Sequence, residues 1–127
     1  MNEVILADTD VLVDYLRGHP MALSLVKEHK KRIIVSAITV AELYAGVRGP
    51  TEMEALEDAL SFHRVVPVTT GTAESAGLLK REYGKSHGLG LPDAIVAATA
   101  QSENAELWTL NVKHFPMFPG LKPAYTK

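Results

Sequence analysis

Four short and mostly apolar runs, each of strand length, are separated along the chain by segments whose apolar residues recur at helical spacing. The runs cover residues 4–7, 33–35, 65–68 and 106–110. Strands that are apolar at successive positions have both faces buried, and this is typical of parallel sheets. Strands alternating with helices therefore predict an α/β fold of three layers, with helices on both faces of a parallel sheet.

Six helices are expected between and after these runs. They are expected after Asp8 as far as Leu16, over residues 21–31, from Thr39 to Val47, around 53–60, over 72–86, and from Pro92 to about residue 100. Pro67 cannot donate to a ladder, so the strand that contains it is expected at a sheet edge. A short fifth strand is expected near residues 122–125. The basic run at residues 30–32 is read as a helix end, where cations complement the helix dipole.

Size and composition limit the classes of protein to which the chain can belong. Its 127 residues suit a single domain spanning 1–127, and no stretch approaches the roughly 20 apolar residues that a membrane span requires. The residues around Met1 lack the basic and apolar regions of a signal peptide, and cysteine is absent. We therefore expect a cytoplasmic protein that does not enter membranes. A formal charge of −2 confines any nucleic-acid contact to local patches.

Three acids and one amide follow strands or begin helices. Asp8 lies at the carboxyl end of the first strand, Glu42 and Asp93 are expected in the first turns of two helices, and Asn111 is expected to end the fourth strand. In open α/β sheets, ligands bind beyond the carboxyl ends of the strands, where helices begin. We therefore expect these four side chains at one edge of the sheet.

Each acid also has a purely structural alternative. Asp8 suits an N-cap, Asp93 opposes a helix dipole, and the segment from Thr39 to Glu42 matches a capping box. The coincidence of three acids on one rim favours a cluster instead. Two carboxylates about 4 Å apart repel by roughly 4 kcal/mol at an effective dielectric constant near 20, so the cluster needs a cation or raised pKa values.

The donor set indicates which cation such a cluster would take. Oxygen ligands without cysteine suit Mg²⁺ or Mn²⁺, and the five histidines show no paired spacing for zinc. A divalent ion of this kind activates water and neutralises charge on a phosphodiester. The sequence therefore predicts metal-dependent phosphodiester hydrolysis.

Four segments together carry a family resemblance. They are residues 4–10 with Asp8-Thr9-Asp10, 36–43 with Glu42, 91–100 with Asp93, and 109–115 with Asn111. In order and spacing they resemble the PIN-domain ribonucleases, and among these the VapC toxins of bacterial and archaeal toxin–antitoxin pairs.

The resemblance has several implications. It implies that Asp8, Glu42 and Asp93 hold the metal and that five strands lie in the order 3-2-1-4-5. It further implies an RNA substrate such as tRNA or rRNA, a homodimer, and inhibition by a VapB-type antitoxin.

Two positions depart from the family pattern. Asn111 stands where many relatives have a fourth acid, and Asp10 stands where asparagine or serine is more usual. An asparagine ligates weakly through its carbonyl or positions water, and Asp10 adds charge to the site. The number of metal ions therefore stays open.

Other residues near these motifs are candidates for accessory roles. Thr9 is a candidate for holding the first acid or forming a turn, and Arg48 and Lys113 are candidates for contacting the RNA backbone. His114 either faces the site or ends the turn, and it is not assigned as a general base.

Three alternative readings remain. A phosphatase of the haloacid dehalogenase type shares a strand ending in Asp8-Thr9-Asp10, but it leaves Glu42 without a purpose. A receiver domain needs an acceptor aspartate after its third strand, where this chain has Thr69 and Thr70. The third alternative is a catalytically degenerate PIN module that binds RNA or protein, against which the intact acid trio argues.

Overall fold

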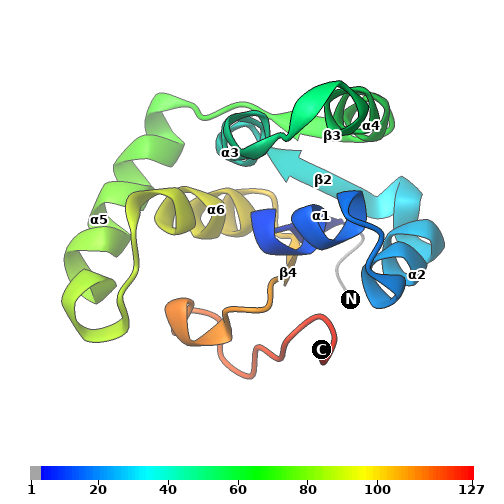
Figure 1. Cartoon of the computed structure of the whole chain (residues 1–127). Helices are drawn as coiled ribbons and strands as arrows, with labels where there is room; N and C mark the ends of the chain where they lie inside the picture. Colours follow the sequence, from blue (N-terminus) through cyan, green and yellow to red (C-terminus); the bar gives the residue numbers. More distant parts are fainter. Residues whose placement is uncertain (1–3) are drawn as a thin grey trace.

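A computed structural model describes residues 4–127, which form a parallel sheet with helices on both faces (Figure 1). The expectation about the signal peptide rests largely on Met1–Glu3, which lie outside the described residues. The strands are β1 (Ile5–Ala7), β2 (Ile33–Ser36), β3 (Arg64–Val66) and β4 (Glu106–Trp108). The α-helices are α1 (Thr9–Leu16), α2 (Pro20–His29), α3 (Ala37–Gly46), α4 (Gly49–Ser61), α5 (Thr70–His87) and α6 (Leu91–Ser102), with short 3-10 turns η1 (Lys30–Arg32) and η2 (Val112–His114).

The sheet has the strand order β3-β2-β1-β4, and every neighbouring pair is parallel. The predicted α/β class and the edge position of the third strand are therefore confirmed, although Pro67 follows β3 rather than lying in it. The basic run also lies where a helix ends, in the 3-10 turn η1 after α2.

The predicted fifth strand near residues 122–125 is wrong, since the sheet formed by residues 4–127 has four strands. The segment does run beside the end of β4, where the Ala124 amide donates to the Thr109 carbonyl at 3.0 Å. Pro123 lies within this segment, and a proline cannot donate to a ladder, so the single bond is not extended into a strand pairing.

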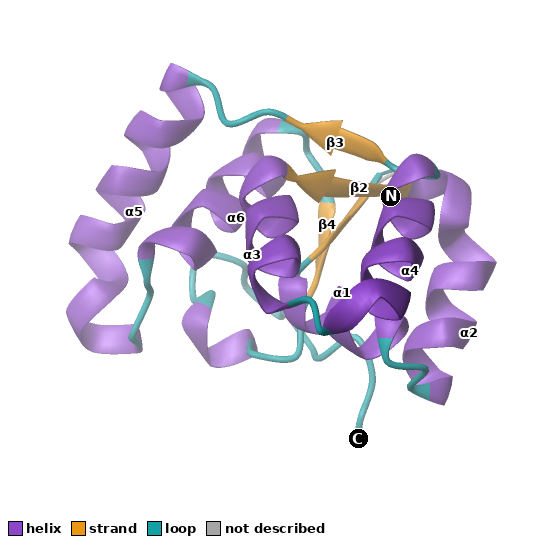
Figure 2. Cartoon of the chain, turned by 45° about the horizontal axis from the view of Figure 1, so that its top comes forward, coloured by secondary structure: helices purple, strands orange, loops and turns teal. Residues whose placement is uncertain are grey.

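Alternate residues of the two central strands supply two separate cores, because successive side chains of a strand point to opposite faces. Ile5 and Ala7 of β1 pack with α1, α2 and α4 on one face. Leu6 packs with α6 and with Phe115 on the other. This explains the unbroken apolar runs of the sequence, and Figure 2 shows the strands between these helical layers.

Helix α6 is the most deeply buried helix of the fold. Its buried residues are Ala94, Val96, Ala97, Ala98, Thr99 and Ala100, and α5 packs against its outer side. Its small side chains permit close approach to both the sheet and α5, as the sequence predicts. Among residues 4–127, no helix is long and apolar enough to cross a membrane.

We predict that Ala97→Leu destabilises the fold by about 1–3 kcal/mol, because three extra carbons must enter a filled interior. Ala97 is a fully buried residue of α6 that packs against the sheet. Ala73→Leu, at an exposed position of α5, is the matched control and should change stability by no more than about 0.5 kcal/mol. Urea unfolding measures both, and an equal effect in the two variants would contradict this account of the α6 packing.

Candidate active site

The site begins at Asp8, which links β1 to α1. Its backbone amide donates to the Trp108 carbonyl at 2.8 Å, so the strand pairing with β4 continues to this residue. Its Oδ1 accepts the Thr9 amide at 2.8 Å, which makes Asp8 the N-cap of α1. Asp8 therefore caps α1 and also lies at the carboxyl end of β1. Its structural role as a cap does not exclude a role in binding a ligand.

Asp8 is buried, with only 4 % of the residue exposed. Burial raises its pKa to about 7, and the negative charges of Asp10 and Asp93 add to this rise, while hydrogen bonds from Thr109 and the Thr9 amide oppose it. Burial also raises the pKa of Asp10, with a further contribution from Asp93. Asp8, Asp10 and Asp93 therefore form one electrostatically coupled group at the carboxyl ends of β1 and β4.

Thr109 is a buried residue directly after β4 that contacts two of these acids, Asp8 and Asp10. Its hydroxyl donates to Asp8 Oδ2 at 2.9 Å, lies 3.4 Å from Asp10 Oδ2 and accepts the Asn111 amide at 3.1 Å. Thr109 lies in the fourth motif segment, residues 109–115, but the sequence alone predicts no role for it. A hydroxyl at the end of a buried strand, two residues before Asn111, was the available signal.

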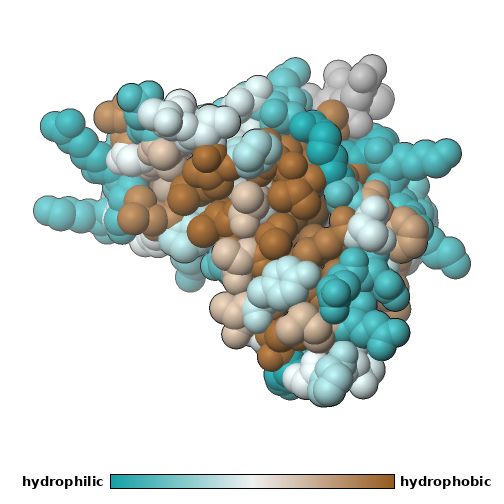
Figure 3. All heavy atoms as spheres, turned by 90° about the horizontal axis from the view of Figure 1, so that it is seen from above, coloured by the Kyte–Doolittle hydropathy of each residue, from teal (hydrophilic) through white to brown (hydrophobic). Residues whose placement is uncertain are grey.

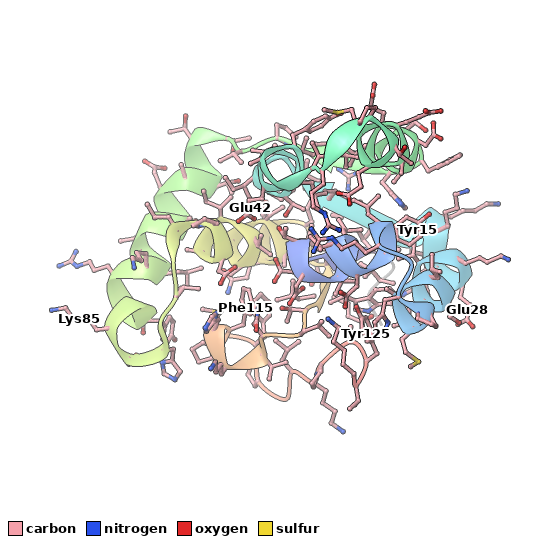
Figure 4. All side chains as sticks on the ribbon, in the orientation of Figure 1. Tyr15, Glu28, Glu42, Lys85, Phe115 and Tyr125 are labelled. Atoms are coloured by element: carbon pink, nitrogen blue, oxygen red, sulfur yellow. The ribbon has the colours of Figure 1, made fainter. Side chains whose placement is uncertain are left out.

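Glu42 is connected to the rest of the site by a hydrogen bond from Thr9 and not by a contact with another acid among residues 4–127. It lies in the second turn of α3, because Ser36 caps that helix by accepting the Ile38 amide and the helix begins at Ala37. The predicted capping box from Thr39 to Glu42 and the first-turn position of Glu42 are therefore wrong. The Thr9 hydroxyl donates to Glu42 Oε1 at 2.7 Å and lies 3.2 Å from the Thr39 hydroxyl. This hydroxyl therefore holds Glu42 and not Asp8. Figure 4 shows Glu42 between α3 and α6.

Asp93 lies in the first turn of α6, as the sequence predicts. Its Oδ2 is 3.2 Å from His114 Nδ1, so His114 faces the site and restrains this carboxylate. Asn111 lies three residues beyond β4 rather than at its end, and its Nδ2 donates to Asp10 Oδ2 at 3.3 Å.

The two candidate cations for RNA binding differ in their surroundings. Arg48 forms an exposed ion pair with Glu52 at 3.0 Å, so part of its guanidinium is engaged on α4. Lys113 is exposed in η2, next to His114, and makes no ion pair within residues 4–127. Lys113 is therefore adjacent in the chain to the residue that contacts Asp93.

The acids do not form a closed metal cage. Within residues 4–127, no group of three histidine, aspartate or glutamate side chains converges closely enough to hold a metal ion as the side chains stand. Mg²⁺ needs less, because it keeps several waters and is usually bound by one or two carboxylates together with substrate phosphates. Buried, mutually repelling carboxylates with oxygen donors fit such an open divalent site.

Comparison with known proteins places this geometry in a family. The family model for the PIN domain matches residues 5–115, so the chain belongs to the PIN-domain family. This assignment replaces the phosphatase and receiver alternatives.

Two relatives are the Mycobacterium tuberculosis ribonucleases VapC19 and VapC10. VapC19 is 44% identical over 124 residues, which cover 94% of this chain and 98% of the relative. VapC10 is 41% identical over 125 residues, which cover 96% and 93%. A solved toxin–antitoxin complex from Klebsiella pneumoniae matches with a TM-score of 0.81 and 31% identity, covering 95% of this chain and 98% of that chain.

We predict that Thr109→Val lowers the free energy of unfolding by about 1.5–3 kcal/mol at pH 8, because a buried carboxylate loses its hydroxyl donor while the side-chain shape is kept. Thr99→Val is the control. Thr99 is equally buried, but its hydroxyl donates only to the Ile95 carbonyl of its own helix, so a change below about 1 kcal/mol is expected. Equal losses in the two variants would show that Thr109 has no special relation to Asp8.

A second prediction concerns pH. A carboxyl whose pKa is raised on folding from 3.8 to about 7 contributes stability that is complete below pH 4 and lost as pH rises to about 7. In EDTA, the unfolding free energy should therefore fall between pH 5 and pH 8. Asp8→Asn should reduce this fall and be more stable than wild type at pH 8. If Asp8→Asn is less stable than wild type at pH 8, the buried carboxylate is not a destabilising charge.

Proposed function

We propose that the chain is a VapC-type toxin that hydrolyses RNA phosphodiester bonds as an endoribonuclease, with Asp8, Glu42 and Asp93 holding a divalent cation. The observation that carries the proposal is the buried Asp8 carboxyl, which is electrostatically coupled to Asp10 and Asp93 at the carboxyl ends of parallel strands. Such a group is costly without a cation and is the environment in which a divalent ion is bound strongly. The ribonuclease names of two relatives support the choice of reaction.

Mg²⁺ is the proposed ion, with Mn²⁺ as a substitute, because the donors are all oxygens. When bound, it would supply polarisation of the phosphodiester and a lowered pKa for an attacking water. Asp8 is held in place by Thr9 and Thr109, Asp93 by His114, and Glu42 by the Thr9 hydroxyl. Each carboxylate therefore begins from a restrained position, and Glu42, which is exposed on α3, has the most freedom to turn toward an ion.

Asn111 is the proposed fourth polar group of the site. Its amide nitrogen is committed to Asp10, which leaves its carbonyl oxygen for a weak ligand or for a water. Lys113 and Arg48 are proposed to contact RNA phosphates, since phosphate contacts position a nucleic acid without reading its bases. The proposed substrate class is a structured cellular RNA such as tRNA or rRNA.

We also propose that a VapB-type antitoxin inhibits the chain and that the chain forms a homodimer. The Klebsiella pneumoniae neighbour is a toxin–antitoxin complex. Several large apolar side chains are exposed here, among them Leu78 at 64 %, Phe62 at 59 % and Leu91 at 54 %. Figure 3 shows apolar atoms gathered across the face seen from above, between hydrophilic margins. Exposed apolar surface of this kind is typical of protein-binding faces.

We predict that Asp8→Asn and Asp93→Asn each reduce RNA cleavage by at least about a thousandfold while the far-UV circular dichroism spectrum stays native, because each removes a proposed metal ligand. Glu42→Gln should reduce cleavage in the same direction. Glu74→Gln is the control, since Glu74 is exposed on α5, and full activity is expected. Cleavage is measured on total cellular RNA by mapping new 5′ ends, with Mg²⁺ present or replaced by EDTA.

Two outcomes would contradict the proposal. Wild-type protein that cuts no cellular RNA with Mg²⁺ or Mn²⁺, yet binds RNA with an affinity that Asp8→Asn leaves unchanged, would identify a degenerate binding module. Full cleavage by both aspartate variants would show that the active site lies elsewhere.

A further inference from the structure

Asp10 is bound by more donors than any other acid of the site. Its Oδ1 accepts the Val11 amide at 2.8 Å, while its Oδ2 accepts the Leu110 amide at 2.9 Å and Asn111 Nδ2 at 3.3 Å. The Thr109 hydroxyl lies 3.4 Å from the same Oδ2. These donors come from the first turn of α1 and from the segment that follows β4, which are about 100 positions apart in the chain.

The geometry of these bonds requires a carboxylate. Two backbone amides approach opposite oxygens of the side chain, so both polar atoms must be acceptors. An asparagine has one acceptor oxygen and one donor nitrogen, and in either orientation its nitrogen would face a backbone N–H. A serine would reach one amide at most. Asp10 is therefore suited to joining the two segments in a way that a neutral residue is not.

The same bonds limit what else Asp10 can do. Asp8 receives one donor on each oxygen, whereas Asp10 Oδ2 is already approached by two amide groups and a hydroxyl. Ligation of a cation through that oxygen would displace bonds that hold Leu110 and Asn111. The contact also sets the orientation of the Asn111 amide group, because Nδ2 faces Asp10 and the carbonyl Oδ1 takes no part in this bond.

We propose that Asp10 is a positioning residue: its carboxylate fixes the Thr109–Asn111 segment against α1 and turns the Asn111 carbonyl toward the reacting groups, rather than ligating the metal. This inference rests on the proposed ribonuclease function. In this proposal the fourth polar group of the site is a pair of residues: Asp10 supplies the negative charge that holds Asn111, and Asn111 supplies the carbonyl oxygen.

The test compares Asp10→Asn with Asp14→Asn as the matched control. Asp14 is on the same helix, and its carboxylate also accepts two bonds, from the Tyr125 hydroxyl at 2.6 Å and Lys127 Nζ at 3.0 Å, but it contacts none of the proposed site residues. Both variants remove one negative charge from α1. Cleavage of a labelled oligoribonucleotide, chosen from the mapped 5′ ends, gives kcat and KM for each protein.

We expect Asp10→Asn to lower kcat by roughly 10- to 100-fold, the usual effect of losing a residue that orients a ligand. KM should change by less than about threefold, because the substrate contacts remain. Asp14→Asn should keep the wild-type kcat. Unchanged kcat in Asp10→Asn, or an equal loss in both variants, would overturn the proposal.

A second readout needs neither RNA nor metal. In ¹⁵N-labelled metal-free protein, the side-chain NH₂ signals of Asn111 are assigned by their loss in Asn111→Ser. They should shift in Asp10→Asn and stay in place in Asp14→Asn. If they stay in place in Asp10→Asn, the contact is absent and the proposal fails. If wild type cuts no RNA while these signals behave as expected, the proposed function fails and the Asp10–Asn111 contact stands.

Discussion

The site depends on a carboxyl group placed where water hardly reaches it. Asp8 follows β1 directly, and the pairing with β4 carries it into the buried end of the sheet. Burying a charge costs free energy unless it is paired, so the metal-free protein partly avoids the charge through a raised pKa. The same position is well suited to a cation, which would remove both the burial cost and the repulsion from Asp10 and Asp93. In this account, the protein gives up stability to keep a site ready for metal.

The three consecutive residues Asp8, Thr9 and Asp10 each form a hydrogen bond to a segment that is distant in the chain. Asp8, the N-cap of α1, accepts a hydrogen bond from Thr109. In the first turn of α1, Thr9 donates to Glu42 of α3, and Asp10 accepts the Leu110 amide of the segment after β4. The sheet and α1 are rigid elements, so functional groups tied to them are held more accurately than groups on free loops. The site is thus assembled by hydrogen bonds among distant segments, while no three of the described acids and histidines form a ready cage.

Much of this was predictable from the sequence, because the signals are local. Apolar runs predicted parallel strands, and the carboxyl ends of such strands predicted where Asp8, Asp93 and Asn111 would lie. The failures arose where tertiary contacts override local patterns. The Thr39–Glu42 capping box was a valid pattern, but Ser36 caps the helix earlier and Thr9 takes the Glu42 carboxylate. The expected fifth strand near residues 122–125 does not form because Pro123 within it cannot donate to a ladder. The role of Thr109 depends on contacts with residues about 100 positions away, which no local pattern records.

The most direct test of the central claim is calorimetric titration of metal-free protein with MnCl₂ at pH 7, repeated in buffers of different ionisation enthalpy to count the protons released. A buried acid with a pKa near 7 must lose its proton when it ligates a cation. We therefore predict that wild type binds Mn²⁺ with release of a fraction of a proton, that the release grows as pH is lowered toward 6, and that Asp8→Asn shows neither the binding nor the release. Mn²⁺ binding without proton release, or binding that Asp8→Asn retains, would contradict the account.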